Sequence, residues 1–206
     1  MTTPLGTIEV GPREGRRITV ARTTRETEIT VTLGLDGEGH TSIATGIGFY
    51  DHLLGSFAHH GLFDLAIHAD GDLHVDEHHT VEDVALVLGS ALAEALGDRS
   101  GIQRFGNSTV PMDESIATAI IDVGGRPYSV IDLPFLGERA GGLPLQLVEH
   151  ALESFARTAG ATLHLSGRGR NDHHLAEAAF KALGRALRVA CETDPRREGV
   201  ASTKGA

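Results

Sequence analysis

The strongest constraint on this chain is that its sequence repeats itself. The stretch 77–82, EHHTVE, is matched by DHHLAE at 172–177, an offset of 95 residues. Farther upstream, Asp51-His52 matches Glu149-His150 at an offset of 98 residues, so a short insertion separates the two blocks. A repeat on this scale is typical of a duplicated unit whose two copies bury a shared hydrophobic core.

The duplication sets the expected domain organisation. A chain of 206 residues is long enough for one sizeable domain. We expect a single domain over 1–206, built from two half-domains at roughly 16–97 and 104–194. A C-terminal tail at 195–206 follows the second half-domain.

Hydrophobic periodicity predicts the same elements in both halves. In the first half, alternating apolar residues predict strands at 29–35 and 63–67, and helical spacing predicts helices at 51–58 and 81–96. The second half repeats the pattern, with elements expected at 149–156, 161–165 and 176–190. Each half is therefore strand, strand, helix, strand, helix. This is an α+β pattern, in which the helices cover one face of a small sheet.

Composition and charge exclude several classes of protein. Asp and Glu outnumber Lys and Arg by 28 to 18, a net charge of −10, and an acidic chain is a poor partner for nucleic acid. No apolar run reaches the ~18 residues that a membrane span needs. Cys191 is the only cysteine, which fits a reducing compartment, and the first residues show no secretory signal. We expect a cytoplasmic protein that binds neither nucleic acid nor membrane.

Six of the 12 histidines lie at matching places in the repeated blocks, and this predicts metal binding. On a helix, adjacent histidines diverge by about 100°, whereas residues three or four apart share a face. One helix therefore gives one histidine of each pair to a given ion, and two ions would each be completed by groups from the other repeat. The candidate ligands are six histidines and two glutamates: His52, His78, His79, Glu82, His150, His173, His174 and Glu177.

These eight ligands also predict what kind of metal site forms. Two octahedral ions would keep open positions, which is typical of a catalytic site. Zinc, iron, nickel and manganese all accept ligand sets rich in imidazole, so the pattern leaves the metal open.

Eight short motifs, in order along nearly the whole chain, carry a family resemblance. They are RTTRET at 22–27, TGIGFYDH at 45–52, GDLHVDEHHTVED at 71–83, RFG at 104–106, VPMDE at 110–114, GRPY at 125–128, NDHH at 171–174 and STKG at 202–205. With these motifs the chain resembles the imidazoleglycerol-phosphate dehydratases of histidine biosynthesis.

The resemblance implies a fold, a cofactor and an assembly. It implies helices packed between two four-stranded sheets, and two divalent metal ions per active site, most simply Mn²⁺. It implies a homo-oligomer of 24 subunits built from trimers, with active sites between subunits. Carried over by matching motif, the metal ligands are the same eight residues that the repeat selected.

The resemblance also implies a reaction, carried out by a carbon–oxygen lyase (a hydro-lyase). Water is removed from D-erythro-imidazoleglycerol phosphate to give imidazole acetol phosphate. The C–H proton that must leave has no adjacent carbonyl, so we expect a route through a metal-bound imidazolate and a diazafulvene-like intermediate.

Individual residues acquire roles from the matching motifs. Glu26 is expected to contact substrate as an acid/base group, with Glu82 and Glu177 as the catalytic metal-binding carboxylates. The residues expected to bind the substrate phosphate are Arg104, Arg126, Ser202 and Lys204. Spacing alone would make Glu26 an exposed residue at the start of an edge strand. Asp76 and Asp172, beside the histidine pairs, are interpreted as helix caps or as supports for the ligands.

Two other functions remain open from the sequence. A dinuclear metal hydrolase acting on a phosphate ester would use the same ligands, although such sites usually contain more carboxylates. A non-catalytic metal storage or transport protein would carry unpatterned histidines and would not need arginines near them.

Overall fold

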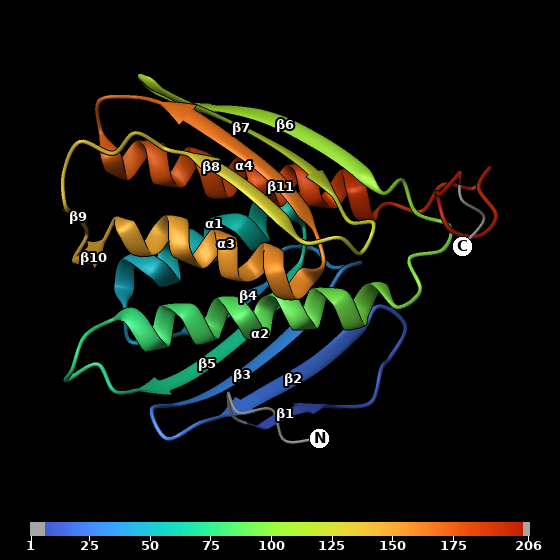
Figure 1. Ribbon diagram of the computed structural model, residues 1–206, viewed down its shortest axis with the longest axis horizontal. Helices are drawn as coiled ribbons and strands as arrows, with labels where there is room; N and C mark the ends of the chain where they lie inside the picture. The colour runs from blue at the N-terminus through green and yellow to red at the C-terminus, as the bar shows by residue number, and fades with distance from the viewer. Residues whose placement is uncertain (1–6, 204–206) are drawn as a thin grey trace.

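Two sheets enclose four helices in this computed structural model, which describes residues 7–203 (Figure 1). The first sheet has the order β1-β2-β3-β5-β4, and the second has the order β6-β7-β11-β8. The strands of the first sheet are β1 (Thr7–Val10), β2 (Arg17–Thr23), β3 (Thr27–Gly34), β4 (Thr41–Ala44) and β5 (Asp64–Gly71). Those of the second are β6 (Phe105–Met112), β7 (Ser115–Asp122), β8 (Tyr128–Asp132) and β11 (Thr162–Arg168). The small hairpin is β9 (Arg139–Ala140) with β10 (Leu143–Pro144), and the helices are α1 (Gly48–Gly61), α2 (His78–Leu96), α3 (Gln146–Ala159) and α4 (Asp172–Cys191).

The two halves of the chain have the same topology. In each half, two antiparallel strands are followed by a short edge strand, a helix, a central strand and a second helix. The edge strand is parallel to the central one in both sheets, β4 to β5 and β8 to β11. The predicted α+β class, with helices between two sheets, is confirmed. The structure adds one strand before the first helix of each half, and β1 as a fifth strand of the first sheet.

The helices form the middle layer because apolar side chains point toward them from both sheets. Inward-facing residues such as Val20 and Val31 in the first sheet, and Ile121 and Leu163 in the second, are almost completely buried. Within residues 7–203, no helix combines the length and the apolar character needed to cross a bilayer.

The helices pair across the two halves, not within them. α2 of the first half packs along α3 of the second half, and α1 packs along α4. Glycine makes both approaches close. A Cβ at Gly89 would lie 2.1 Å from Thr158 Oγ1, and one at Gly184 would lie 2.2 Å from the carbonyl oxygen of Phe57. The partners in each pair run in the same direction, so α2 and α3 begin side by side, as do α1 and α4.

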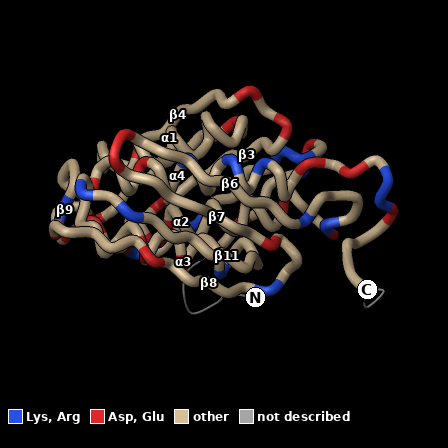
Figure 2. Tube along the Cα trace, turned by 90° about the horizontal axis from the view of Figure 1, so that it is seen from above, with Lys and Arg blue, Asp and Glu red and all other residues tan. Residues whose placement is uncertain are grey.

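Because the paired helices are parallel, their first turns lie at one end of the molecule and their last turns at the other. In Figure 1, α2, α3 and α4 begin at the left end, where the hairpin β9–β10 lies, and the C-terminal tail projects at the right end. The tail is tied to the segment after α2 through isolated bridges between Ile102 and Thr193 and between Ser100 and Val200. Seen from above, the tail loop stands away from the body and carries both basic and acidic residues (Figure 2).

The two close helix contacts predict an unusual substitution pattern. Alanine is intrinsically better than glycine in a helix by about 1 kcal/mol. Nevertheless, Gly89→Ala and Gly184→Ala should each lower the free energy of unfolding by about 1–3 kcal/mol, because the new methyl group overpacks against a neighbouring backbone. Chemical denaturation measures the effect.

Gly55→Ala in α1 is the matched control. A Cβ at Gly55 meets nothing within 4 Å, so this variant should be neutral or slightly stabilised. Equal stability of Gly55→Ala, Gly89→Ala and Gly184→Ala would contradict the role of close helix packing.

Candidate metal centre

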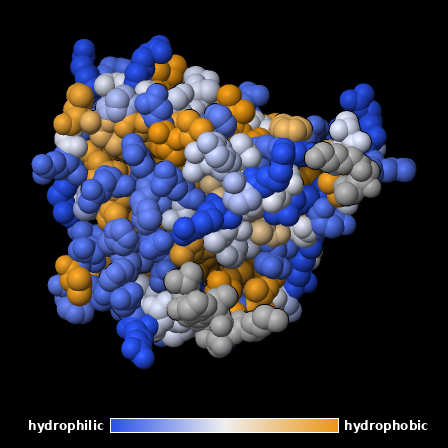
Figure 3. Space-filling view, viewed as in Figure 1, coloured by the Kyte–Doolittle hydropathy of each residue, from blue (hydrophilic) through white to orange (hydrophobic). Residues whose placement is uncertain are grey.

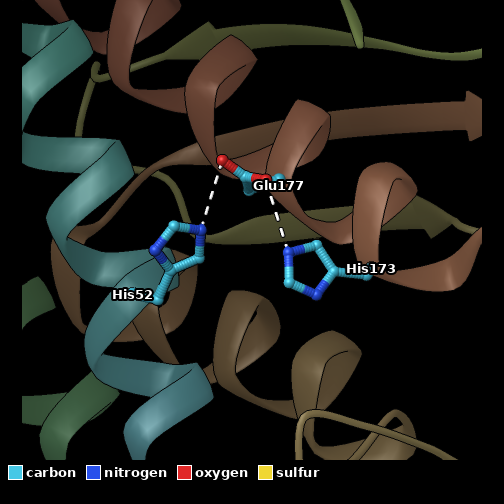
Figure 4. Close-up of side chains that lie close together, drawn as sticks. All are labelled: His52, His173 and Glu177. Carbon is cyan, nitrogen blue, oxygen red and sulfur yellow. Dashed lines mark ion pairs between the residues drawn. The ribbon is translucent and has the colours of Figure 1, made fainter. Parts of the chain in front are cut away.

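One group of metal-ligand side chains lies where α1 meets α4. His52 Nε2 is 3.2 Å from Glu177 Oε1, and His173 Nε2 is 3.5 Å from Glu177 Oε2. Figure 4 shows both imidazoles turned toward the single carboxylate. Burial acts to raise the pKa of Glu177, but the Lys181 ammonium 2.8 Å away and the two imidazoles outweigh it and hold this pKa below its usual value.

A second group lies where α2 meets α3. His78 Nε2 is 3.9 Å from Glu82 Oε2, and His150 Nε2 is 3.6 Å from Glu82 Oε1. The centroids of the two imidazole rings are 4.9 Å apart. His150 Nε2 is buried without a hydrogen-bond partner. Arg157 Nη2 also contacts Glu82, at 3.3 Å.

Both groups therefore draw on both halves of the chain. His52 comes from the first half and meets His173 and Glu177 from the second, whereas His150 of the second half meets His78 and Glu82 of the first. The crossed pairing of the helices causes this exchange. Each group contains two histidines and one glutamate, and only one histidine of each adjacent pair.

The other histidine of each pair points elsewhere and is held by a carboxylate. The rings of His78 and His79 are 85° apart, as are those of His173 and His174. His79 Nδ1 lies 3.0 Å from Asp72 and 3.8 Å from Glu26. The hydrogen bond to Asp72 raises the pKa of His79.

His174 has the equivalent environment in the second half. Its Nδ1 lies 2.9 Å from Glu114 Oε2, and this contact raises the pKa of His174 and lowers that of Glu114 to about 2. A carboxylate on Nδ1 orients the ring and leaves Nε2 as the atom that can bind a metal.

The supporting carboxylates Asp72 and Glu114 were not predicted from the sequence. A signal was present for Glu114, because Glu26 and Glu114 each stand directly before the second strand of a half, β3 and β7. Asn171 is the N-cap of α4 and accepts hydrogen bonds from the backbone N–H groups of His173 and His174. Asp76 stands just before Glu77, the N-cap of α2, and accepts the backbone N–H of His78, so it holds the first turn of α2. In the second half the cap is therefore Asn171 and not Asp172.

The donor chemistry of both groups fits a divalent metal ion. Each combines two imidazole nitrogens with one carboxylate, a set that suits zinc, iron, nickel or manganese. The Nε2 of His150 supports this most directly, because it is buried beside Glu82 without a hydrogen bond, and a buried polar atom that lacks one is costly. Three protein ligands leave each group incomplete, so further ligands must come from elsewhere.

A segment found only in the second half links both histidine pairs. The connection from β8 to α3, residues 133–145, which we call the strap, contains the hairpin β9–β10. The corresponding connection in the first half is only 45–47. Asp172, beside His173, accepts hydrogen bonds from the N–H groups of Leu136 at 2.9 Å and Gly137 at 2.7 Å. Arg139 pairs with Glu77, beside His78.

The strap also forms one wall of a cavity of about 690 Å³ whose other residues include His78 and Glu149. Hydrophilic side chains gather over this end of the molecule, on the face seen in Figure 3. The strap thus places an accessible cavity, lined by both charged and apolar residues, beside one of the two ligand groups.

Of the residues expected to bind phosphate, Arg104 lies at the other end of the molecule. The backbone N–H of Arg104 donates to the carbonyl oxygen of Ala190 at 2.9 Å, near the end of α4. His174 stands at the start of that helix, about 24 Å away at 1.5 Å per residue. Arg126 is exposed between β7 and β8, Ser202 is partly exposed in the tail, and Lys204 falls outside the described residues. Within residues 7–203, the structure therefore does not bring Arg104 and the paired histidines of one chain together.

Comparison with known proteins agrees with the geometry. Residues 45–187 match the family described as imidazoleglycerol-phosphate dehydratase. A relative of that name from Methanoculleus marisnigri is 54% identical over 186 residues, covering 90% of this chain and 96% of the relative. The crystal structure of the same enzyme from Staphylococcus aureus has a TM-score of 0.77 at 32% identity, covering 91% of this chain and 100% of that one. The crystal structure of IGPD from Pyrococcus furiosus has a TM-score of 0.76 at 38% identity, covering 90% of this chain and 99% of that one.

The contacts of the strap predict a local change in dynamics. Asp172→Ala removes the acceptor of two backbone N–H groups, and hydrogen bonds to a charged group contribute about 1.5–3 kcal/mol. The amides of Leu136 and Gly137 should therefore exchange with solvent roughly tenfold faster or more, as measured by hydrogen exchange. Asp172→Asn retains one acceptor oxygen and should be intermediate. Unchanged exchange in Asp172→Ala would mean that Asp172 does not hold the strap.

Proposed function

The chain belongs to the imidazoleglycerol-phosphate dehydratase family and is a hydro-lyase of histidine biosynthesis, and on this premise we propose how its residues perform the reaction. The proposed reaction is the dehydration of D-erythro-imidazoleglycerol phosphate to imidazole acetol phosphate. The observation that carries the proposal is the pair of matched His-His-Glu groups, each built from both halves of the chain.

Two divalent metal ions, most simply Mn²⁺, are proposed to occupy these groups. His52, His173 and Glu177 would hold one ion, and His78, Glu82 and His150 the other. Held by these residues, the two ions would supply Lewis-acid chemistry that favours the imidazolate form of the substrate's ring. Imidazole is the substrate's own reactive group, which accounts for a site that is paired and rich in histidine.

The reaction is proposed to run through a diazafulvene-like intermediate. The hydroxyl on the carbon attached to the ring leaves with its bonding electrons, as the ring supplies an electron pair to that carbon. The neighbouring carbon then loses its proton to a base, which gives an enol. Tautomerisation of the enol returns a proton to the carbon next to the ring and produces the ketone, so the net loss is one water.

Glu26 is the proposed acid/base group. Its carboxylate lies 3.8 Å from His79 Nδ1, and its side chain is 54% exposed, so it can reach a bound substrate. Glu82 and Glu177, each placed between two imidazoles, act by fixing the ions. Arg104, Arg126, Ser202 and Lys204 are proposed to bind the phosphate, with the arginines as bidentate donors.

The active site is proposed to form between subunits of a homo-oligomer of 24 chains built from trimers. Two observations support assembly. The short glycerol chain of the substrate cannot bridge the two ends of α4, so one chain cannot supply both the ions and the phosphate residues. In addition, His79 and His174 belong to neither of the two His-His-Glu groups, so we propose that these histidines complete the metal sites of neighbouring chains.

The metal sites predict linked losses of metal and activity. The wild type should bind two Mn²⁺ per chain and dehydrate imidazoleglycerol phosphate. His78→Ala and His173→Ala should each lose one of the two ions and nearly all activity, because a catalytic His-His-Glu group loses a ligand. Metal analysis with an activity assay on the same samples checks both results.

His164→Ala is the matched control, because His164 is an exposed histidine on β11, outside both groups. It should keep two ions and full activity. Wild-type protein that hydrolyses a generic phosphomonoester instead would favour a metal hydrolase. Metal-loaded wild-type protein that is inert toward the imidazole substrate would favour metal storage.

Sharing of the site predicts complementation between inactive variants. Oligomers of His78→Ala alone or of Arg104→Ala alone should have low activity with limiting substrate. When the two variants are dissociated, mixed and reassembled, part of the activity should return, because some sites combine an intact His78 with an intact Arg104 from different chains. No recovery in mixed oligomers of confirmed composition would mean that one chain supplies both residues.

A further inference from the structure

The guanidinium of Arg104 is held on three sides by the chain itself. Its Nε and Nη2 donate side-on to Asp122, at 2.7 Å and 2.9 Å. Its Nη1 donates to the carbonyl oxygen of Ala201 in the tail. The ring of Phe105 lies against the face of the guanidinium, 4.8 Å from its central carbon. Of the five N–H bonds, these contacts use three and leave two for a ligand.

Asp122 is the centre of this arrangement. Its Oδ1 accepts the Arg104 Nε–H and also the backbone N–H of Gly124 at 2.8 Å. Gly124 begins the turn that carries Arg126. Asp122 and Arg104 are both only 15% exposed at their side chains, so the pair is well shielded from water. The Arg104 guanidinium, and to a smaller extent that of Arg126, lowers the pKa of Asp122.

A carboxylate at this position has an electrostatic cost for an anion site. Its negative charge repels a phosphate and neutralises part of the positive charge of Arg104. An electrostatically optimal phosphate site would therefore lack Asp122. The compensating benefit must be geometric, because a side-on arginine–carboxylate pair fixes the plane and direction of the guanidinium.

We propose that Asp122 is a positioning residue for the substrate's phosphate. It locks Arg104 so that the two remaining N–H groups face the ligand, fixes the turn before Arg126, and through Arg104 holds the tail segment at Ala201. This inference rests on the proposed function, because it takes the phosphate site from there.

The test is whether removing a negative charge weakens phosphate binding. In the metal-loaded full-length oligomer, Asp122→Asn should raise the KM for imidazoleglycerol phosphate about tenfold, a loss typical of misplaced binding groups. kcat should change much less, because the ring chemistry takes place at the metal ions. The inhibition constant of inorganic phosphate should rise in parallel, and the tail segment 193–203 should exchange its amide hydrogens faster.

Asp36→Asn is the matched control. Asp36 makes the same side-on pair with Arg16, and Arg16 also donates to a backbone carbonyl, that of Cys191. This second pair holds no residue of the proposed phosphate site. Asp36→Asn should leave both KM and phosphate inhibition unchanged. Asp122→Glu keeps the charge and should recover part of the affinity, and it serves as the test variant if Asp122→Asn does not assemble.

The possible outcomes separate the two proposals. A wild type without dehydratase activity would overturn the proposed function. An active wild type with equal or tighter phosphate binding in Asp122→Asn would overturn the positioning role, because that is the electrostatic result alone. Weaker phosphate binding together with a loosened tail would support it.

Discussion

The close approach of helices from different halves is the constraint on which the rest of this structure depends. Gly89 and Gly184 occupy equivalent positions in α2 and α4, and each lets a helix of the other half lie directly against backbone. Because the paired helices are parallel, their first turns lie side by side. His150 is thereby brought to His78 and Glu82, and His52 to His173 and Glu177. A pairing within each half would have separated the ligands of both groups.

The geometry of adjacent residues on a helix also supports the proposed assembly. Adjacent residues on a helix diverge by about 100°, so only one histidine of each pair belongs to a His-His-Glu group of its own chain. The other histidine lies outside that group. Asp72 and Glu114 hold His79 and His174 in a defined orientation, which is consistent with a role for these two rings as ligands in the proposed assembly. The position of Arg104, beside the end of α4, supports the same proposal through a separate observation.

Much of this arrangement could be predicted from the sequence, because the same histidine motif and apolar spacing occur in both halves of the chain. The apolar spacing of residues 81–96 predicted most of α2, and the repeated histidines indicated a paired metal site before any contact was known. The edge strands β4 and β8 were missed because they are short and mostly exposed, with only one neighbouring strand each. The strap and Asp122 were missed because their partners are distant in sequence: Leu136 contacts Asp172, and Asp122 contacts Arg104. Periodicity reports which face of an element is buried, not which distant residue it meets.

The use of carboxylates explains how an acidic chain can bind an anionic substrate. With a net charge of −10, the protein as a whole repels a phosphate. Many of its carboxylates act locally, however, because Glu82 and Glu177 lie between imidazoles, Asp72 and Glu114 orient histidines, and Asp122 orients Arg104. At each of these positions the carboxylate fixes the orientation of a partner side chain. If the proposed ions occupy the two His-His-Glu groups, their positive charge offsets this local negative charge. Metal binding and attraction of the phosphate would then be coupled through electrostatics, without any change in the fold.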